Sequence, residues 1–215
     1  MKKRLIYVIG ALAVLAGCSD AETTGTATHF SADILSCTQQ SDVGRCFREQ
    51  LEPGQLPQRV YAVERDGNKS VIAFWPNNIT ALSALRSLGL SDQIDVYNVP
   101  VVTAAQAAGL ANVEDGVVSI VNVPSPWYAP KVVINGRMRD AVPDYAAIPG
   151  LDFKYFTTSE SGTLGGIYLW NSRASADAFY DADWHARIQN TYGQSADLQF
   201  YELAQINRGT AEVEQ

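Results

Sequence analysis

From residue 59 onward, the chain consists of short apolar runs separated by glycine, proline and asparagine. β-Branched and aromatic residues alternate or cluster within these runs, and this pattern predicts strands. The runs that we assign to strands are 59–61, 69–77, 94–102, 154–156, 164–172 and 198–206. Two alanine-rich stretches, 79–88 and 174–188, are expected to be helices. The chain is therefore predicted to mix strands with helices.

The predicted strands belong to an internal repeat. The run 69–77 aligns with 164–172 at a constant offset of 95 positions, and the same offset pairs Gly67 with Gly162 in a turn. In the last strands the offset is 104 positions, so the second copy carries nine extra residues around its helix. Two copies of one supersecondary unit predict two similar half-domains.

Each copy also has a predicted front segment. In the second copy a β-rich run at 117–123 comes before an irregular or helical stretch at 130–147. In the first copy we expect a strand at 26–35 and a helix at 38–51. The resulting order of strand, helix, strand, strand, helix, strand is the ferredoxin-like motif. The predicted fold class is α+β, with two tandem ferredoxin-like units at 29–103 and 116–208.

The N-terminus has the features of an export signal. Lys2, Lys3 and Arg4 precede an apolar run at 5–15, which is too short to span a bilayer that needs roughly 20 residues. The run ends in Leu-Ala-Gly-Cys at Cys18, which resembles the lipobox of bacterial lipoproteins. This resemblance implies removal of residues 1–17, acylation of Cys18 (palmitate among the acyl groups) and anchoring in the lipid bilayer.

Two further expectations follow from this N-terminus. The small and polar residues up to 28 are typical of a flexible tether, so we assign 18–28 to the link between lipid and fold. Ser19, rather than aspartate, follows the lipidated cysteine. In a Gram-negative host this implies an outer-membrane protein that faces the periplasm.

The composition fits one exported globular unit. Without residues 1–17 the chain keeps 198 residues, and the loss of three basic side chains leaves 13 basic against 23 acidic ones, a formal charge of −10. This balance argues against nucleic acid as a partner. With 47% hydrophobic and 18% charged residues, the chain is able to bury a sizeable core.

Cys37 and Cys46 are the only cysteines besides Cys18. In an oxidising compartment the pair is a candidate disulfide. Nine residues of continuous helix would separate the two Cα atoms by roughly 13 Å, so a disulfide requires a turn, which Asp42 or Gly44 can supply. The alternative is two buried free thiols.

No cofactor or metal motif is present. The chain has two histidines and no spaced cluster of cysteine and carboxylate residues, so a metal site is not expected. The glycines at 162–166 lie between strands, whereas a dinucleotide fingerprint must open a helix. A serine nucleophile elbow is also absent.

The second copy resembles a known family. The similarity rests on Pro149-Gly150-Leu151, Lys154-Tyr155, Gly165-Gly166-Ile167-Tyr168-Leu169-Trp170, Ser172-Arg173, Ala176 and Phe179-Tyr180. These residues resemble those of the YdhR-like proposed monooxygenases, members of the dimeric α/β-barrel superfamily. The resemblance implies that two ferredoxin-like units pair their sheets into a barrel. Because both units lie in one chain, we expect an internal pseudo-dimer and a monomeric protein.

The alternation of side chains along the strands then predicts a ligand site. Tyr168 and Trp170 share one strand face with Gly166, and we expect this face to line the barrel interior while Ile167 and Leu169 cover the helices. The residues assigned to ligand binding are Trp75, Asn122 and Tyr155. The alternative is that the aromatic side chains simply fill the core.

Two functions remain open. The first is a ligand-binding or structural barrel for a small hydrophobic molecule, which we favour because no nucleophile or base stands beside an orienting group. The alternative is a monooxygenase or isomerase of the resembled family, with Tyr168, Trp170 and His185 as the catalytic residues. His185 is a candidate general base, although a histidine beside Asp183 on a helix is also typical of a solvated face.

Overall fold

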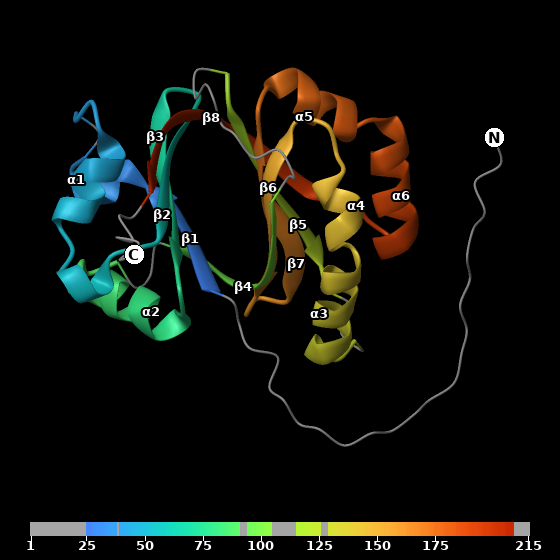
Figure 1. Cartoon of the computed structure of the whole chain (residues 1–215), viewed down its shortest axis with the longest axis horizontal. Coiled ribbons are helices and arrows are strands. Elements are labelled where there is room, and N and C mark those ends of the chain that lie inside the picture. The colour runs from blue at the N-terminus through green and yellow to red at the C-terminus, as the bar shows by residue number, and fades with distance from the viewer. Residues whose placement is uncertain (1–24, 38, 91–93, 105–114, 126–128, 209–215) are drawn as a thin grey trace, which may run out of the picture.

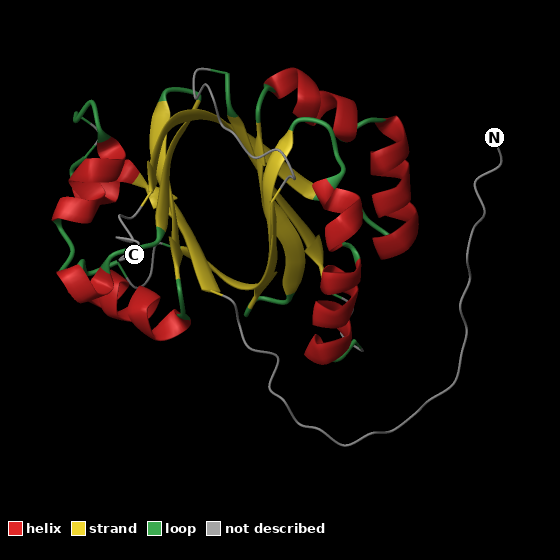
Figure 2. Cartoon of the chain, in the orientation of Figure 1, coloured by secondary structure: helices red, strands yellow, loops and turns green. Residues whose placement is uncertain are grey.

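The strands of the protein close into one antiparallel barrel. The computed structural model describes residues 25–37, 39–90, 94–104, 115–125 and 129–208. Within them eight strands form a closed ring, and helices cover the ring on two opposite sides (Figure 2). The first half of the chain supplies α1 and α2 on one side, and the second half supplies α3 to α6 on the other (Figure 1).

Each half of the chain contributes four consecutive strands of the ring. Around the ring the order is β1-β3-β2-β8-β5-β7-β6-β4, so each half contributes its own strands in the order fourth, first, third, second. The halves join where β2 pairs with β8 and where β4 pairs with β6, both antiparallel. The strands are β1 (Gly25–Ser31), β2 (Arg59–Arg65), β3 (Asn68–Trp75), β4 (Asp95–Ala104), β5 (Val117–Pro124), β6 (Leu151–Ser159), β7 (Thr163–Trp170) and β8 (Asp197–Arg208).

Side-chain caps mark the start of α1, α2, α5 and α6, whereas α3 and α4 have none. Asn77 accepts a hydrogen bond from the Thr80 amide at the start of α2, and Asp181 does the same for the Trp184 amide at the start of α6. Asp181 thereby divides the helix predicted at 174–188 in two. The helices are η1 (Ala32–Leu35), α1 (Val43–Glu49), η2 (Pro53–Gln55), α2 (Asn78–Ser87), α3 (Lys131–Asp140), α4 (Val142–Ala146), α5 (Arg173–Phe179) and α6 (Ala182–Tyr192).

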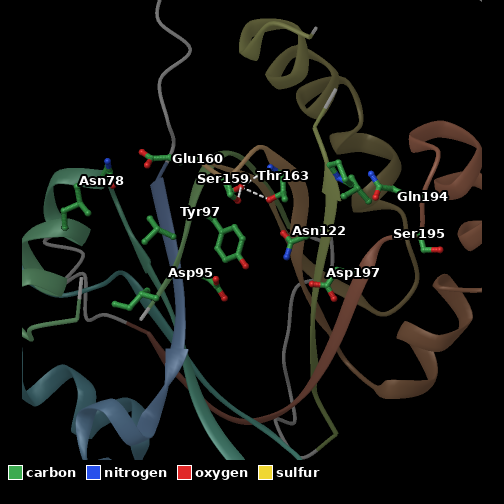
Figure 3. Close-up of a pocket in the computed structure, with 16 residues that line it drawn as sticks. Asn78, Asp95, Tyr97, Asn122, Ser159, Glu160, Thr163, Gln194, Ser195 and Asp197 are labelled. Carbon is green, nitrogen blue, oxygen red and sulfur yellow. Dashed lines mark hydrogen bonds between the residues drawn. The ribbon is translucent and has the colours of Figure 1, made fainter. Parts of the chain in front are cut away.

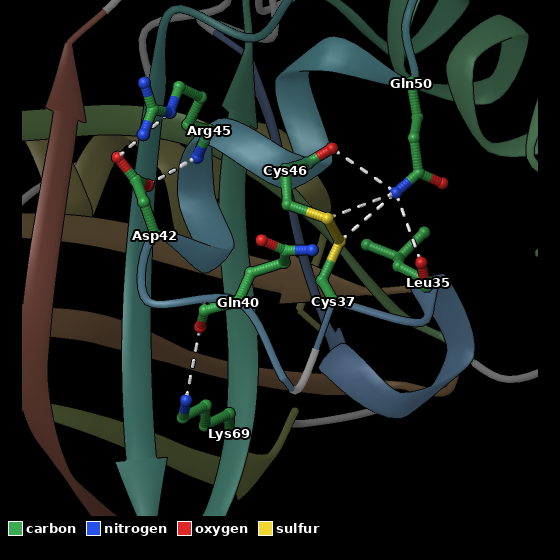
Figure 4. The surroundings of a disulfide bond; sticks show 8 residues. All are labelled: Leu35, Cys37, Gln40, Asp42, Arg45, Cys46, Gln50 and Lys69. Atoms are coloured by element: carbon green, nitrogen blue, oxygen red, sulfur yellow. Dashed lines mark hydrogen bonds and ion pairs between the residues drawn. A yellow bond between two sulfur atoms is a disulfide. The ribbon is translucent and has the colours of Figure 1, made fainter.

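The first half departs from its predicted boundaries. β1 begins at Gly25 and therefore includes the last four residues that we assigned to the tether. It ends at Ser31, where η1 replaces the rest of the predicted strand. The helix predicted from residue 38 starts only at Val43, because Cys37 and Cys46 form a disulfide with their Cα atoms 5.9 Å apart. Asp42, the cap of α1, provides the turn that this bridge requires (Figure 4).

The side chain of Gln50 packs against this disulfide. Its Nε2 atom donates hydrogen bonds to the carbonyl oxygens of Leu35 and Cys46, at 3.2 and 3.3 Å (Figure 4). The link ties the end of α1 to η1. The disulfide therefore closes a small helical layer over the outer face of the first half.

The predicted assignment of strand faces was wrong. Ile167 and Leu169 point into the barrel together with Val118, Ile120 and Tyr155. Tyr168 and Trp170 instead pack beneath the helices of the second half, and Trp75 packs beneath those of the first. The layer between sheet and helices offers polar partners to the indoles: Trp170 Nε1 donates to Ser119 Oγ at 2.9 Å, and Trp75 Nε1 donates to the Gln55 carbonyl at 3.0 Å.

In the part of the chain that the structure describes, no helix is long and apolar enough to cross a membrane. Cys18 and the predicted signal peptide lie outside the described residues.

Candidate functional site

A cavity of about 470 Å³ lies between the second half of the barrel and its helices. We call it the sheet–helix pocket. Its floor comes from β5, β6 and β7, and its walls come from α3, α4 and α6. The lining residues are mainly apolar: Val121, Val123, Ala129, Pro130, Val133, Ile134, Arg137, Met138, Ala141, Tyr145, Lys154, Phe156, Leu164, Gly165, Tyr168, Trp184, Ile188, Thr191 and Tyr192. A concave, largely apolar space with few polar groups is typical of a small-molecule site.

Lys154 is the unusual residue of this pocket. It lies on the helix-facing side of β6, between the inward-pointing Phe153 and Tyr155, and only 3% of its surface is exposed. Its Nζ atom lies 3.2 Å from the ring centroid of Tyr145, 3.9 Å from that of Phe156 and 4.7 Å from that of Tyr168. Three aromatic rings therefore surround a buried amine.

The amine has no polar partner among the described residues. Neither a hydrogen bond nor an ion pair joins it to any of them. Burial lowers the pKa of Lys154 well below its ordinary value, because a charged ammonium loses its hydration in an apolar site. Buried lysines are rare without a partner, so this side chain requires an explanation.

Glycine 166 on the neighbouring strand makes room for this lysine. A Cβ atom added at Gly166 would lie 3.1 Å from Lys154 Cε and 3.0 Å from the ring of Tyr168. At Gly165 an added Cβ would overlap the carbonyl of Val121 on β5. Gly165 thus lets β5 and β7 approach closely, and at Gly166 a side chain would require the lysine and Tyr168 to shift.

Two tyrosine hydroxyls accompany the amine. Burial raises the pKa of Tyr168 well above its ordinary value, and the contact with Tyr145 raises it further. The pKa of Tyr145 is also raised by burial, while the hydrogen bond with Tyr168 lowers it. Both phenols stay protonated near neutral pH, so they act as neutral hydrogen-bonding groups.

A second, more polar cavity of about 760 Å³ lies at one end of the barrel. Figure 3 shows Tyr97 of β4 pointing toward Asn122 of β5, with Asp95 and Asp197 nearby. Burial raises the pKa of Tyr97 to about 12, Asp95 raises it as well, and the hydrogen bond with Asn122 lowers it. Among the described residues, no group of side chains could hold a metal ion.

The structure does not bring the predicted site residues together. Asn122 lines the cavity at the barrel end, whereas Tyr155 lies inside the barrel, where its hydroxyl accepts a 2.8 Å hydrogen bond from Arg59. Tyr168 lines the sheet–helix pocket. His185 is exposed on α6 and lines neither cavity, a position that agrees with the alternative of a solvated helix face.

Sequence reasoning did not assign Lys154 to the site. In the sequence, Asp152 and Lys154 alternate with Leu151, Phe153 and Tyr155, a pattern that predicts a solvent-facing lysine, and only the structure shows that both faces of this strand are buried. Within the sequence, Lys154 contributes only to the family resemblance.

The lipid anchor is supported by comparison with known proteins. Residues 1–19 match the prokaryotic membrane lipoprotein lipid attachment site. The chain carries a lipoprotein attachment site. A lipid-anchored location in the cell envelope follows from this motif. No curated protein sequence matches the chain.

Several solved structures share the fold. One is an uncharacterized ferredoxin fold protein related to antibiotic biosynthesis monooxygenases from Listeria monocytogenes 4b F2365, with 10% identity and a TM-score of 0.54 over 85% of this chain and 95% of the other. An anthrone oxidase-like protein has 9% identity and a TM-score of 0.54 over 88% and 95% of the chains. A heme-degrading enzyme from Listeria monocytogenes has 12% identity and a TM-score of 0.50 over 83% and 99%. At these identities the likeness shows a ferredoxin-like α+β fold.

Proposed function

We propose that this protein is a lipid-anchored envelope protein that binds a small apolar molecule in the sheet–helix pocket. The observation that supports this is a cavity of about 470 Å³ whose apolar walls end at one buried, unpaired amine. This volume lies within the range of known small-molecule sites, roughly 300–1,000 Å³. The barrel interior, where we first expected the ligand, holds packed aromatic and aliphatic side chains instead.

The binding test uses two neighbouring valines at the start of α3. Val133 lines the pocket and is 45% exposed, whereas Val132 is 63% exposed and does not line it. The indole of Val133→Trp should block the mouth of the pocket, whereas the indole of Val132→Trp should point to solvent. The mature chain carrying Cys18→Ser would be titrated with 2-naphthylmethanol by calorimetry.

We expect one saturable site per chain, at least tenfold weaker binding in Val133→Trp and unchanged binding in Val132→Trp. Equal binding by both variants, or no saturable binding, would overturn the proposal. Circular dichroism of both variants checks that each is folded.

A second candidate is oxygenation of the bound molecule. It is supported by the phenols of Tyr145 and Tyr168 beside the amine, and by the names of the structural neighbours, one of which is an anthrone oxidase-like protein. The test is oxygen uptake with anthrone, which the wild-type chain should catalyse and Tyr168→Phe should slow. Uptake no faster than in buffer would exclude this activity on anthrone.

We also propose that the two halves form an internal pseudo-dimer, so that the chain works as a monomer. The matching strand orders of the halves and their junctions at β2–β8 and β4–β6 support this, because the closed ring leaves no free sheet edge for a second copy. Light scattering of the C18S chain as it elutes from a size-exclusion column should give the mass of one chain. A mass of two chains at micromolar concentration would contradict it.

Sorting to the outer membrane, facing the periplasm, remains part of the proposal for a Gram-negative host. It rests on Ser19 after the lipidated cysteine. Fractionation of a tagged chain should recover it with the outer membrane, and recovery with the inner membrane would refute this point.

A further inference from the structure

We propose that Lys154 is a nucleophilic amine that forms an imine with a small apolar aldehyde or ketone bound in the sheet–helix pocket. The inference rests on the proposed function, because it takes the same pocket as the binding site. It adds a reaction and a chemical class of ligand.

The geometry provides an amine that is free to react. Lys154 Nζ has no carboxylate and no hydrogen-bond acceptor among the described residues, and it faces the cavity. A structural lysine is normally paired when it is this deeply buried. Gly166 leaves the space that the Cε end of the side chain occupies.

The surroundings favour the neutral form of the amine. Burial lowers its pKa, because the apolar walls of the pocket replace the hydration of an ammonium. The tyrosines that line the pocket with it, Tyr145, Tyr168 and Tyr192, have pKa values raised by burial, so they bring no negative charge at neutral pH. The ring faces attract an ammonium, but less strongly than water or a carboxylate does.

A neutral amine in such a site adds to a carbonyl carbon. The Nζ lone pair forms the C–N bond while the C=O π electrons move to oxygen, and a proton passes from nitrogen to that oxygen. The carbinolamine then loses its hydroxyl group with the remaining nitrogen proton as water, which leaves the C=N bond. No oxidant or reductant is needed. Desolvated lysines are activated for this chemistry in other proteins.

The walls define the class of carbonyl compound. Tyr145, Phe156 and Tyr168 present ring faces or edges around the amine, and Trp184 closes the side toward α6. Planar aromatic molecules pack well against such rings. We therefore expect an aromatic aldehyde or ketone to be preferred to a hydrophilic one.

The lysine content makes the test simple. After residues 1–17 are removed, the chain has three lysines, of which Lys131 at the start of α3 is exposed and Lys154 is buried. The C18S chain would be incubated with 2-naphthaldehyde and cyanoborohydride at pH 7, which reduces an imine to a stable secondary amine. Peptide mapping by mass spectrometry then locates the naphthylmethyl group.

We expect Lys154 to be labelled at least tenfold faster than Lys131. Lys154→Met should abolish this labelling, and Val133→Trp should reduce it at least tenfold while Lys131 still reacts. Val132→Trp should behave as wild type. Glyceraldehyde, a hydrophilic aldehyde, should show no preference for Lys154.

The outcomes separate the two proposals. If 2-naphthylmethanol binds but Lys154 is labelled no faster than Lys131, the imine is refuted and the binding function stands. If neither compound binds, both proposals fail. Because Val133→Trp leaves the lysine in place, the inference remains testable even if Lys154→Met does not fold.

Discussion

Replacing Lys154 by methionine should stabilise the protein at neutral pH. Methionine has nearly the same length and fills the same space against Tyr145 and Phe156, but it carries no amine to desolvate. Burial of this amine without a polar partner lowers the stability of the wild-type chain. The substitution should therefore raise stability while it removes the proposed nucleophile, a trade-off typical of functional residues.

The size of the effect follows from the lost hydration of one ionisable group, which binds a proton at pH 7 in the unfolded chain and is held in an apolar site in the folded chain. Replacing a buried ionisable group by a well-packed apolar one commonly stabilises by about 1–4 kcal/mol. We expect a net gain of about 1–3 kcal/mol at pH 7. For a chain of this size that is a rise in Tm of roughly 2–10 °C.

The pH dependence gives a second, sharper signature. Because the pKa of Lys154 is lower in the folded than in the unfolded chain, the unfolded chain binds more protons between these two pKa values. The cost of Lys154 is thus largest below its folded pKa and disappears as the pH rises to its unfolded pKa near ~10.4. Within that window wild-type stability should gain up to ~1.4 kcal/mol per pH unit relative to the variant.

Urea unfolding of the wild type and of Lys154→Met between pH 6 and about pH 9.5 measures both effects, with Lys131→Met as the control for an exposed lysine. The advantage of the variant should shrink as the pH rises. A variant less stable than wild type by more than about 1 kcal/mol at pH 7, or a difference independent of pH, would refute the reasoning, since the amine would then have a stabilising partner.

Three further changes test the barrel and the layer that covers its first half. Tyr155→Phe removes two 2.8 Å hydroxyl hydrogen bonds inside the barrel and should cost about 1–3 kcal/mol in urea unfolding; a neutral result would mean that these bonds contribute nothing. Cys37→Ser with Cys46→Ser opens the disulfide and should lower stability by about 2–3 kcal/mol under oxidising conditions only, whereas an equal loss under reducing conditions would contradict a role for the bridge. Gly165→Ala places a methyl group on the carbonyl of Val121 and should cost about 3 kcal/mol or more; wild-type Tm would show that β5 and β7 have room to separate.

The order of elements could be predicted from the sequence because it depends on local patterns. The turn glycines Gly67 and Gly162 both adopt positive φ, at 79° and 84°, which few other residues tolerate, and each lies between the two strands of a hairpin. The repeat around them indicated strand, turn, strand and helix in both halves. Boundaries that depend on single contacts were less predictable: the disulfide delays the start of α1, and the Asp181 cap divides the second helical stretch.

The sequence by itself determined the anchor motif and the α+β pattern, since each is carried by neighbouring residues. Alternation also showed that Tyr168 and Trp170 share a face, but a period of two does not say which face points inward. The tertiary structure decided that, because the barrel interior takes the aliphatic side chains of β7 while the sheet–helix layer accommodates the large rings and the polar partner of the indole. It also decided the character of Lys154, because the three rings that surround its amine come from α4, β6 and β7 and meet only when these elements pack together.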